Sequence, residues 1–550
     1  MLVAEAVGRA LVEAGVDHVF GVVGSGNFHL TNAMVAAGAR FVATRHEGGA
    51  ATAADAYART SDRVAAVTLH QGCGLTNAMT GVAEAAKSRT PLVVVAAEVT
   101  QPRSNFYVDQ TALAEAVGAV PVRIGSAASA VADARAAVAL ARDQRRTVLL
   151  NVPLDVQGEE SAADAGDRTP TDGPDRHGRA PSEDDLGTLL DALASAQRPV
   201  FVAGRGARGA GPELALLAER CGALLATSAV ARGLFVADPW SLDVSGGFST
   251  PLAAELIAGA DLVVGWGCAL NMWTMRHGRL IGPGTTVVQV DDEAASIGVH
   301  RPGALGVVGD VGATARAAAE RLFGSREGYR TAEVGARIVA EGRWRDVPYD
   351  DDSTTDAAGQ PARIDPRTLT LALDDLLPRE RVVGVDSGNF MGYPSAYLAV
   401  PDERGFCFTQ AFQSIGLGLA TTIGAALAQP DRLPVAALGD GGALMGAAEL
   451  DTVVRLGLPM VVVVYDDEAY GAEVHHFGPG GHRLDTVEFP PTDVAAIGRG
   501  YGLDAVTVRG TDDLAGVARW LEGSRDRPLL VDAKITSAPS WWLEEAFRGH

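Results

Sequence analysis

Short runs of apolar residues alternate along the whole chain with longer stretches in which apolar residues recur at helical spacing. Residues 64–69 are one such run, which closes in the glycine-rich turn 70–74 before the helical stretch 75–86. An apolar run that ends in glycine and gives way to helical spacing is typical of a strand, a turn and a helix. Repeated along the chain, this unit predicts an α/β fold with parallel sheets and helices on both faces.

Two polar stretches divide these units into three α/β domains. Residues 158–185 are rich in Asp, Gly, Pro and Ser, and residues 324–363 are also polar, so we predict a linker at each. They separate a first domain at residues 1–157, a central domain at 186–323 and a third domain at 364–550 that ends in a tail. With 550 residues the chain is too long for one core, and the first and third domains look like one plan used twice.

Three strands of the first domain end in residues that carry chemistry. Because the carboxyl ends of parallel strands meet at one edge of a sheet, we expect these residues to lie close together. The three strand ends are Gly24-Ser25-Gly26, Arg45-His46-Glu47 and His70-Gln71-Gly72-Cys73-Gly74.

The third domain contains a strand, a glycine turn, a helix, a second strand and an acidic turn. The glycine turn is Gly439-Asp440-Gly441-Gly442, and the acidic turn covers residues 466–471. Glycines let backbone N–H groups approach phosphate oxygens, while Asp440, Asp467 and the carbonyl of Ala469 offer oxygen ligands to Mg²⁺ or Ca²⁺. These residues alone leave open a plain strand-to-helix turn followed by a solvated acidic turn.

Composition narrows the classes of function. The formal net charge is −22 and no basic run offsets it, which argues against nucleic acid or an anionic membrane surface as a partner. No apolar segment reaches roughly 18 residues, and the N-terminus has no signal-like pattern, so we expect a cytoplasmic protein without a membrane span. The four cysteines are scattered without metal-like spacing, so neither a disulfide framework nor a zinc site is predicted.

Taken together, the motifs resemble those of the thiamine-diphosphate (ThDP) enzymes of the acetohydroxyacid synthase, pyruvate decarboxylase and benzaldehyde lyase group. The resemblance runs from the first residues to near the last and is closest in pattern to acetolactate-synthase-like proteins. It rests on residues 45–51, 74–91, 386–389, 416–426 and the Gly439-Asp440-Gly441 motif with Asp467 at the spacing that the family expects. The resemblance implies ThDP and Mg²⁺, or Ca²⁺, as cofactors.

The resemblance also implies a role for each cofactor residue. Glu47 would hydrogen-bond the pyrimidine ring, as a buried carboxyl with a raised pKa can, and Ile415 would wedge between the two rings and bend the cofactor. The remaining cofactor contacts would come from Gly388, Asn389, Gly439, Gly441, Gly442 and Tyr470. In this family the first domain of one subunit faces the third domain of another, which implies a homodimer as the minimum active unit and a tetramer as the expected larger assembly.

Several residues depart from the family pattern or bear on the reaction. Asp467 stands where most relatives carry Asn, so the metal site is more acidic than usual. Glu473 lies where pyruvate decarboxylase relatives have a catalytic Glu, and with His475 it could relay a proton, or the pair could be a solvated helix start. Ser25, Gln71 and Gln110 fall where relatives place residues that face the substrate.

The function that the resemblance implies is acetolactate-synthase-like decarboxylation of a 2-oxo acid, followed by carboligation to a second carbonyl. Alternatives are decarboxylation without ligation, cleavage of a 2-hydroxyketone, and a catalytically silent ThDP-fold subunit that binds or regulates a partner. FAD is not expected, because the central-domain turn at residues 267–271 lacks the Arg of FAD-binding relatives. Trp541 and Trp542 could form a lid over the site or part of a tail packed on the surface.

Overall fold

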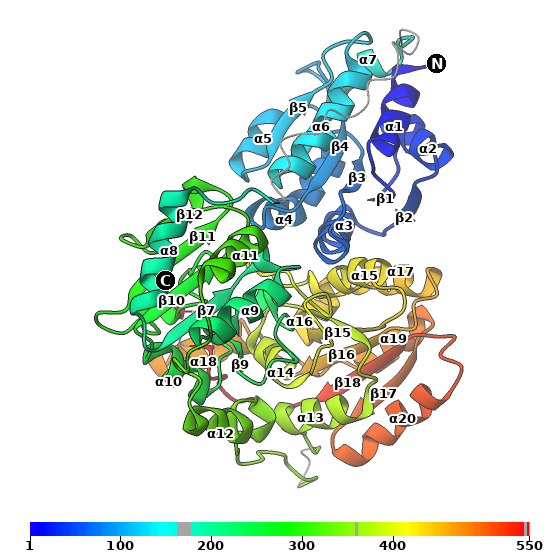
Figure 1. The fold of residues 1–550 in the computed structure, drawn as a ribbon. Coiled ribbons are helices and arrows are strands. Elements are labelled where there is room, and N and C mark those ends of the chain that lie inside the picture. The colour runs from blue at the N-terminus through cyan, green and yellow to red at the C-terminus, as the bar shows by residue number, and fades with distance from the viewer. Residues whose placement is uncertain (162–177, 358–360, 544–546, 549–550) are drawn as a thin grey trace.

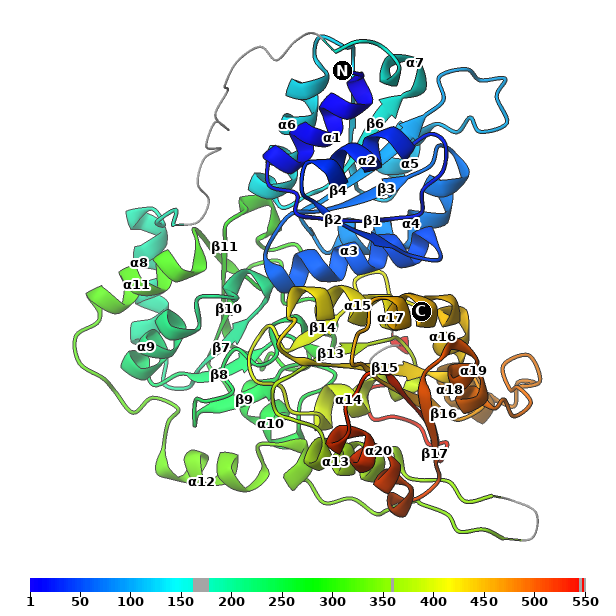
Figure 2. The same ribbon diagram turned by 90° about the vertical axis from the view of Figure 1, so that its right-hand side faces the viewer.

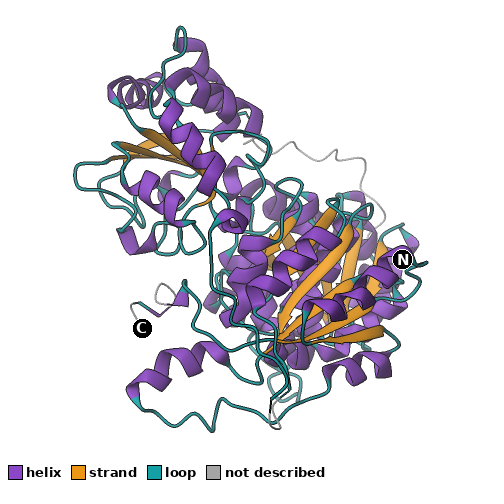
Figure 3. Ribbon diagram, turned by 90° about the horizontal axis from the view of Figure 1, so that it is seen from below, coloured by secondary structure: helices purple, strands orange, loops and turns teal. Residues whose placement is uncertain are grey.

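The protein, described by a computed structural model over residues 1–161, 178–357, 361–543 and 547–548, consists of three α/β domains (Figure 1). Each domain is built on a six-stranded sheet whose strand pairs are all parallel. Helices flank the sheets (Figure 3). The predicted α/β fold with parallel sheets is therefore confirmed.

The first domain has the strand order β2-β1-β3-β4-β6-β5. Its strands are β1 (His18–Gly21), β2 (Arg40–Ala43), β3 (Ala65–Leu69), β4 (Leu92–Glu98), β5 (Val120–Arg123) and β6 (Thr147–Pro153). Its helices are α1 (Val3–Glu13), α2 (Phe28–Ala36), α3 (Glu47–Ser61), α4 (Cys73–Lys87), α5 (Gln110–Ala116), α6 (Ala130–Gln144) and α7 (Leu154–Gln157). The predicted strand ends do meet, because β1 lies between β2 and β3.

The third domain repeats this topology in the order β14-β13-β15-β16-β18-β17. Its strands are β13 (Arg381–Val385), β14 (Phe406–Phe408), β15 (Leu433–Gly439), β16 (Val461–Asp466), β17 (Asp504–Val508) and β18 (Leu529–Lys534). Its helices are α13 (Pro366–Leu376), α14 (Gly392–Tyr397), α15 (Gly418–Ala428), α16 (Asp440–Met445), α17 (Leu450–Arg455), α18 (Gly471–Phe477), α19 (Val494–Tyr501) and α20 (Ala515–Glu522). Inner strands such as β16 are buried at every residue, as expected for a parallel sheet covered on both faces.

The central domain has a different order, β12-β11-β10-β7-β8-β9, which is that of a doubly wound dinucleotide-binding sheet. Its strands are β7 (Pro199–Ala203), β8 (Leu224–Thr227), β9 (Ser241–Val244), β10 (Leu262–Trp266), β11 (Thr286–Asp291) and β12 (Leu305–Val308). Its helices are α8 (Glu183–Ser195), α9 (Gly211–Cys221), α10 (Pro251–Ala258) and α11 (Val311–Arg321). Figure 2 shows the first domain at the top, with the central and third domains side by side below it.

The two predicted linkers differ. Most of residues 158–185 lie outside the described residues. The stretch at 324–363 contains the helix α12 (Ala332–Glu341), whose Val334 and Ile338 pack into the core of the central domain. The sequence did not suggest this helix because only these two buried apolar residues mark it in a polar stretch.

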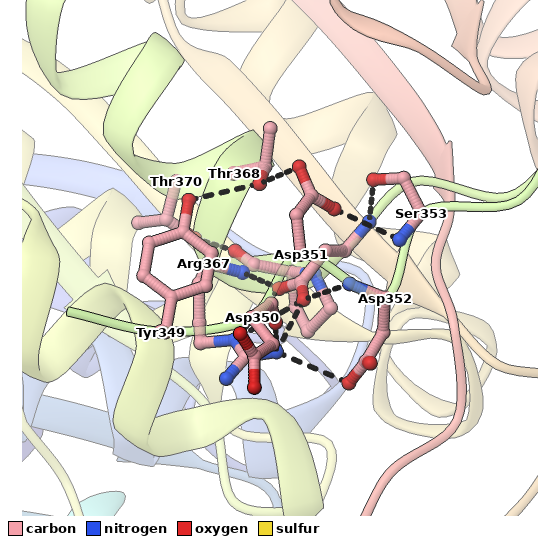
Figure 4. Close-up of polar contacts among 10 residues, drawn as sticks. Tyr349, Asp350, Asp351, Asp352, Ser353, Arg367, Thr368 and Thr370 are labelled. Carbon is pink, nitrogen blue, oxygen red and sulfur yellow. Dashed lines mark hydrogen bonds and ion pairs between the residues drawn. The ribbon is translucent and has the colours of Figure 1, made fainter.

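The end of the second stretch is fixed to the start of α13. Arg367 donates to the Asp352 carboxylate at 3.1 Å, and the Thr368 hydroxyl donates to Asp351 at 2.8 Å (Figure 4). The hydroxyls of Tyr349 and Thr368 lie 2.9 Å apart. The chain therefore enters the third domain through a hydrogen-bonded turn.

The first and third domains pack on each other through α3 and α15, which lie side by side (Figures 1 and 2). Small residues allow the close approach: a Cβ atom added at Gly424 would lie 2.0 Å from the carbonyl oxygen of Ala53. One cluster of buried apolar residues runs across this contact and includes Ala50 and Tyr57 with Leu419 and Ile423. Among the helices of the described residues, none combines the length and apolar character needed to cross a membrane.

Candidate active site

The strand order predicts where each outer domain binds a ligand. In an open parallel sheet, ligands bind outside the carboxyl ends of the strands at the point where the order reverses. In the first domain this point lies between β1 and β3, which lead to Ser25 and His70. In the third domain it lies between β13 and β15, which lead to Asp386 and Asp440. The topology therefore places the candidate residues of both domains at ligand-binding edges.

A cavity of about 1060 Å³, called here the main cavity, opens at the carboxyl edge of the third-domain sheet. It brings together every third-domain cofactor and metal residue that the sequence predicted, together with Glu473. These lining residues are Gly388, Asn389, Ile415, Gly439, Asp440, Gly441, Gly442, Asp467, Ala469, Tyr470 and Glu473.

Two glycines in the wall of the main cavity lie so close to neighbouring side chains that a larger residue would clash there. A Cβ atom at Gly441 would lie 2.6 Å from the ring of Tyr470, and one at Gly471 would lie 2.4 Å from the Asp467 carboxylate. These glycines therefore lie directly against neighbouring side chains, and backbone N–H groups in a glycine turn of this kind can bind an anion.

The acidic residues of the main cavity repel one another. Burial and the nearby charges of Asp467 and Asp466 raise the pKa of Asp440 to about 8. Burial and the charge of Asp466 raise the pKa of Asp467 to about 7. Lys534 forms an ion pair with Asp466 and also with Asp532, so Asp466 has a cationic partner within the protein. Asp440 and Asp467 are the pair left to be neutralised by a ligand.

The first-domain residues form a second polar group. Glu47, at the start of α3, accepts a hydrogen bond from the Asn77 amide at 3.1 Å. The Ser25 hydroxyl and Nε2 of His70 are 3.4 Å apart. Gln71 is 5% exposed, and its Oε1 is buried without a hydrogen-bond partner among the described residues. None of these residues is among the described residues that line the main cavity of the same chain.

Comparison with known proteins decides the family. Residues 1–119 match the N-terminal TPP binding domain of thiamine pyrophosphate enzymes, residues 186–318 the central domain, and residues 386–533 the C-terminal TPP binding domain. The probable 2-ketoarginine decarboxylase AruI of Pseudomonas aeruginosa is 30% identical over 527 residues, which cover 93% of this chain and 90% of that protein. The chain belongs to the thiamine pyrophosphate enzymes.

Two further comparisons agree with this assignment. Sulfoacetaldehyde acetyltransferase of Castellaniella defragrans is 28% identical over 539 residues, which cover 94% of this chain and 89% of that protein. The structure of the Rhodococcus jostii RHA1 thiamine diphosphate-dependent 4-hydroxybenzoylformate decarboxylase has a TM-score of 0.78 at 22% identity, over 98% of this chain and 100% of that chain, and shows the same fold. The family resemblance is confirmed, and the chain is a ThDP-dependent enzyme of the decarboxylase and carboligase type.

The residues of the main cavity fit the cofactor of this ThDP enzyme. The buried carboxylate of Asp440, the partly buried carboxylate of Asp467 and the carbonyl of Ala469 are hard oxygen donors of the kind that Mg²⁺ or Ca²⁺ prefers. The described residues contain no group of three or more His, Cys, Asp or Glu that could hold a metal. A cation bound by Asp440 and Asp467 would therefore share the oxygens of a diphosphate or of water, and the glycine turn is placed to receive the diphosphate.

Asp386 connects the diphosphate edge to Ile415. Its carboxylate is fully buried and accepts hydrogen bonds from the backbone N–H groups of Gly416 at 3.0 Å and Leu417 at 3.2 Å. Burial raises the pKa of Asp386 to about 6, although these backbone donors oppose the rise. The sequence placed Asp386 in a family motif but gave it no role. Its position at the end of a strand could have marked it as a residue of the ligand-binding edge.

The C-terminal tail holds Asn389. The Asn389 amide donates to the carbonyl of Ala538 at 3.0 Å, and its Oδ1 accepts from the Ser540 hydroxyl at 2.8 Å. Trp542 is 1% exposed, packs edge-on against Phe248 of the central domain and lines the main cavity. Trp542 is thus part of the cavity wall and does not belong to a surface tail; residues 544–546 and 549–550 lie outside the described residues.

The two residues of the predicted proton relay, Glu473 and His475, lie in different surroundings. Glu473 lines the main cavity, and its carboxylate makes no hydrogen bond or ion pair to any described residue. His475 does not line that cavity; its Nε2 lies 3.3 Å from the Ser537 hydroxyl, and burial lowers its pKa. Glu473 is therefore available to a ligand, whereas His475 faces the tail.

Gln110 lies beneath the first-domain glycine turn. It is 2% exposed, donates to the Asn151 side chain at 2.8 Å and accepts from the backbone N–H of Gly72 at 3.4 Å. Both ends of the amide are thus used inside the domain, so Gln110 supports the turn and does not reach into the main cavity. Its predicted contact with the substrate stays a prediction.

The sequence placed His70 at a strand end but gave it no role of its own. A Cβ atom at Gly24 would lie 2.1 Å from its ring, so this glycine makes room for it. The ring also lies 5.3 Å from that of Phe106. The signal that could have identified His70 is its position directly after β3, beside the Ser25 turn.

The main cavity continues into the central domain. There it is lined by the turns that follow β7 and β10, with Gly204, Arg205, Gly267 and Cys268. This is the point where the order of the central sheet reverses. That FAD does not bind there stays a prediction.

Proposed function

We propose that this ThDP enzyme decarboxylates a 2-oxo acid and releases the corresponding aldehyde. The observation that carries the proposal is the free carboxylate of Glu473 in the same cavity as Asp440 and Asp467. When bound, ThDP accepts the electron pair that is left as CO₂ departs. A free carboxylate beside that site can hold a proton and deliver it to the carbon that lost CO₂.

The other residues hold the cofactor and the substrate. Asp440, Asp467 and Ala469 would bind Mg²⁺, and the backbone N–H groups of the glycine turn would bind the diphosphate. Glu47 would hydrogen-bond the pyrimidine ring. Ser25 and His70, 3.4 Å apart, would bind the carboxylate or the carbonyl of the substrate.

The active unit in this proposal is a homodimer whose sites lie between subunits. Glu47, Ser25 and His70 do not line the main cavity of their own chain among the described residues. A second copy would therefore supply them. Phe412, Leu444 and Met445, which are 46%, 43% and 56% exposed, leave apolar surface on the third domain that a partner could cover.

Carboligation is the second candidate. The cavity of about 1060 Å³ is at the upper end of what one small ligand needs, so it leaves room for a second carbonyl compound. Release of aldehyde and transfer to an acceptor differ only in whether a proton or a second carbonyl reaches the same carbon.

The test is product analysis of the purified protein with Mg²⁺, ThDP and a panel of 2-oxo acids of increasing size. Aldehyde formed in equal amount to CO₂ would support decarboxylation, and a 2-hydroxyketone formed with added aldehyde would support carboligation. If no 2-oxo acid releases CO₂, both proposals are wrong.

Glu473→Gln separates the two outcomes. We expect the variant to release aldehyde about 100-fold more slowly, because it cannot deliver a proton, and to divert product toward ligation when aldehyde is added. His475→Asn is the matched control, since His475 lies off the main cavity, and it should leave the product ratio unchanged.

A further inference from the structure

Two segments outside the helices and strands lie next to residues expected to touch the cofactor: one contains Ile415, and the other ends directly before Glu47. Residues 409–415 connect β14 to the stretch before α15, and four of them, including Ile415, line the main cavity. Residues 44–46 connect β2 to α3 and end directly before Glu47. Each segment needs contacts outside itself to hold its backbone in place.

A buried glutamate of the first domain binds the third-domain segment. Glu84, on α4, is 0% exposed and accepts hydrogen bonds from the backbone N–H groups of Ala411 at 3.0 Å and Phe412 at 2.6 Å. Asp386 binds the N–H groups of Gly416 and Leu417 at the other end. Ile415 is therefore held between two carboxylates that each bind two successive N–H groups.

A buried glutamate of the third domain binds the first-domain segment in the same way. Glu449, before α17, is 4% exposed and accepts from the backbone N–H groups of Arg45 at 3.1 Å and His46 at 3.0 Å. The Thr452 hydroxyl donates to its other oxygen at 2.6 Å. A Cβ atom at Gly49 would lie 2.4 Å from the Glu449 carboxylate, so this glycine makes room for it.

The charge of Glu84 is maintained by Arg59. The guanidinium lies 2.8 Å from Glu84 and also pairs with Asp55, and all three side chains are buried. Burial opposes ionisation of Glu84, but Arg59 and the two backbone N–H groups outweigh it and hold its pKa below the ordinary value. A buried carboxylate with a cation and several donors keeps its position, because moving it would leave a charge and its donors unpaired.

We propose that Glu84 and Glu449 are reciprocal positioning residues: each domain sets the backbone of the other domain's cofactor-facing segment. This rests on the proposed function only in the assignment of Ile415 and Glu47 to the cofactor. Both segments lie at the contact between the two domains of one chain, but each is held by its own glutamate, and in the proposed homodimer they belong to two different cofactor sites.

The test is hydrogen–deuterium exchange of the full-length protein without cofactor, for wild type, Glu84→Gln and Glu449→Gln. We expect Glu84→Gln to speed exchange of peptides covering residues 409–417 by about tenfold, because a charged hydrogen-bond acceptor for two N–H groups is lost. Glu449→Gln should do the same for residues 44–48. Each variant should leave the other segment near its wild-type rate, so each is a control for the other.

Asp55→Asn is a further matched control. It removes a buried charge from the same cluster, but Asp55 bonds to Arg59 and Thr90 and makes no hydrogen bond to either segment. It should leave exchange of residues 409–417 unchanged. If Glu84→Gln does not fold, Glu84→Asp is the alternative variant, because it keeps the charge but shortens the side chain. It should also speed exchange of residues 409–417, by a smaller factor.

The proposal is overturned if Glu84→Gln and Glu449→Gln leave their segments unchanged, or if Asp55→Asn loosens residues 409–417 as much as Glu84→Gln does. In the holoenzyme, Glu84→Gln should raise the ThDP concentration for half-saturation about tenfold, and Asp55→Asn should not. The exchange result does not depend on any substrate. A wild type that releases no CO₂ but shows the expected exchange would therefore contradict the proposed function alone.

Discussion

The first and third domains share one strand order, yet their ligand-binding edges differ in charge. The third-domain edge places Asp440, Asp466 and Asp467 together, and of these three Asp466 pairs with Lys534, which it shares with Asp532. The first-domain edge places Glu47 beside the neutral amide of Asn77 and brings Ser25 to His70. The same topology thus holds an excess of negative charge in one domain and mostly uncharged hydrogen-bonding groups in the other.

This difference in charge favours a different kind of ligand group at each edge. An acidic pair with raised pKa values is stable only with a cation or with protons. The first-domain edge can receive an uncharged ring without a counter-ion. The two ends of ThDP, a diphosphate carried with a metal and a pyrimidine ring, differ in the same way. Each prediction below changes one side of this comparison.

The largest effect is expected at Glu47. Glu47→Gln keeps a hydrogen-bonding group beside Asn77 but removes the acid, so we expect CO₂ release to fall about 1000-fold. The measurement is kcat with saturating ThDP, and thermal unfolding should be unchanged because the side chain is only partly buried. A loss of less than tenfold would mean that the first-domain edge does not need an acid.

Asp440→Asn tests the acidic side. The wild type should gain about 2.7 kcal/mol of stability when Mg²⁺ and ThDP are present at 100 times their dissociation constants. The variant should lose most of this gain, because one of the two metal carboxylates is gone. The measurement is the free energy of unfolding with and without the cofactors. An equal gain in the variant would place the metal elsewhere.

The stability of the metal-free protein should depend on pH in a stated direction. The pKa values of Asp440 and Asp467, about 8 and about 7, lie above the unfolded value of 3.8. The folded state therefore binds more protons than the unfolded state, and their contribution is full below about pH 4 and is lost as pH rises through 7 and 8. We expect a fall on the order of 2 kcal/mol, measured by urea unfolding with a chelator, and Mg²⁺ with ThDP should reduce it.

The smallest effect is expected for Asp467→Asn. The family pattern that the sequence resembles carries Asn at this position, where its amide oxygen serves as the metal ligand, so we expect Mg²⁺ affinity to fall only about tenfold, or about 1.4 kcal/mol. Without metal, the variant should be more stable than wild type above pH 7, because one repelling charge is removed. Titration of Mg²⁺ in the presence of ThDP measures the first effect. If Asp467→Asn weakened Mg²⁺ binding as much as Asp440→Asn does, the two carboxylates would contribute equally to the metal site.

The sequence indicated which residues lie at the carboxyl ends of the strands, but it did not indicate the contacts between domains. Glycines and acids at strand ends are local signals, and together with the family resemblance they led to Asp440, Asp467 and Glu47, whose roles stay predictions. Glu84 and Glu449 could not be found in this way, since a glutamate in a helical pattern normally indicates an exposed face, and their partners are several hundred residues away in sequence. Gln110 was found by its motif, but its burial under the Gly72 turn depends on Asn151, which no local pattern connects to it.

In the central domain, too, the sequence predicted local elements but not the contacts between distant segments. Its strands follow from apolar runs, but the helix α12 was hidden in a polar stretch, and the reversal of sheet order next to the main cavity appears only in the folded chain. Trp542 is similar: a pair of tryptophans near the C-terminus suggests a lid or a surface tail, whereas it is held in the core by Phe248 and Tyr393.

The packing of α3 on α15 has a consequence for synthesis of the chain. Nearly every residue of α3 from Ala50 to Thr60 is buried, and α15 supplies much of that cover. The helix α15 begins at Gly418, so at about 5–20 residues per second the ribosome would need on the order of half a minute to produce it after α3. During that interval the face of α3 that packs on α15 is exposed, and transiently exposed apolar surface of this kind favours aggregation.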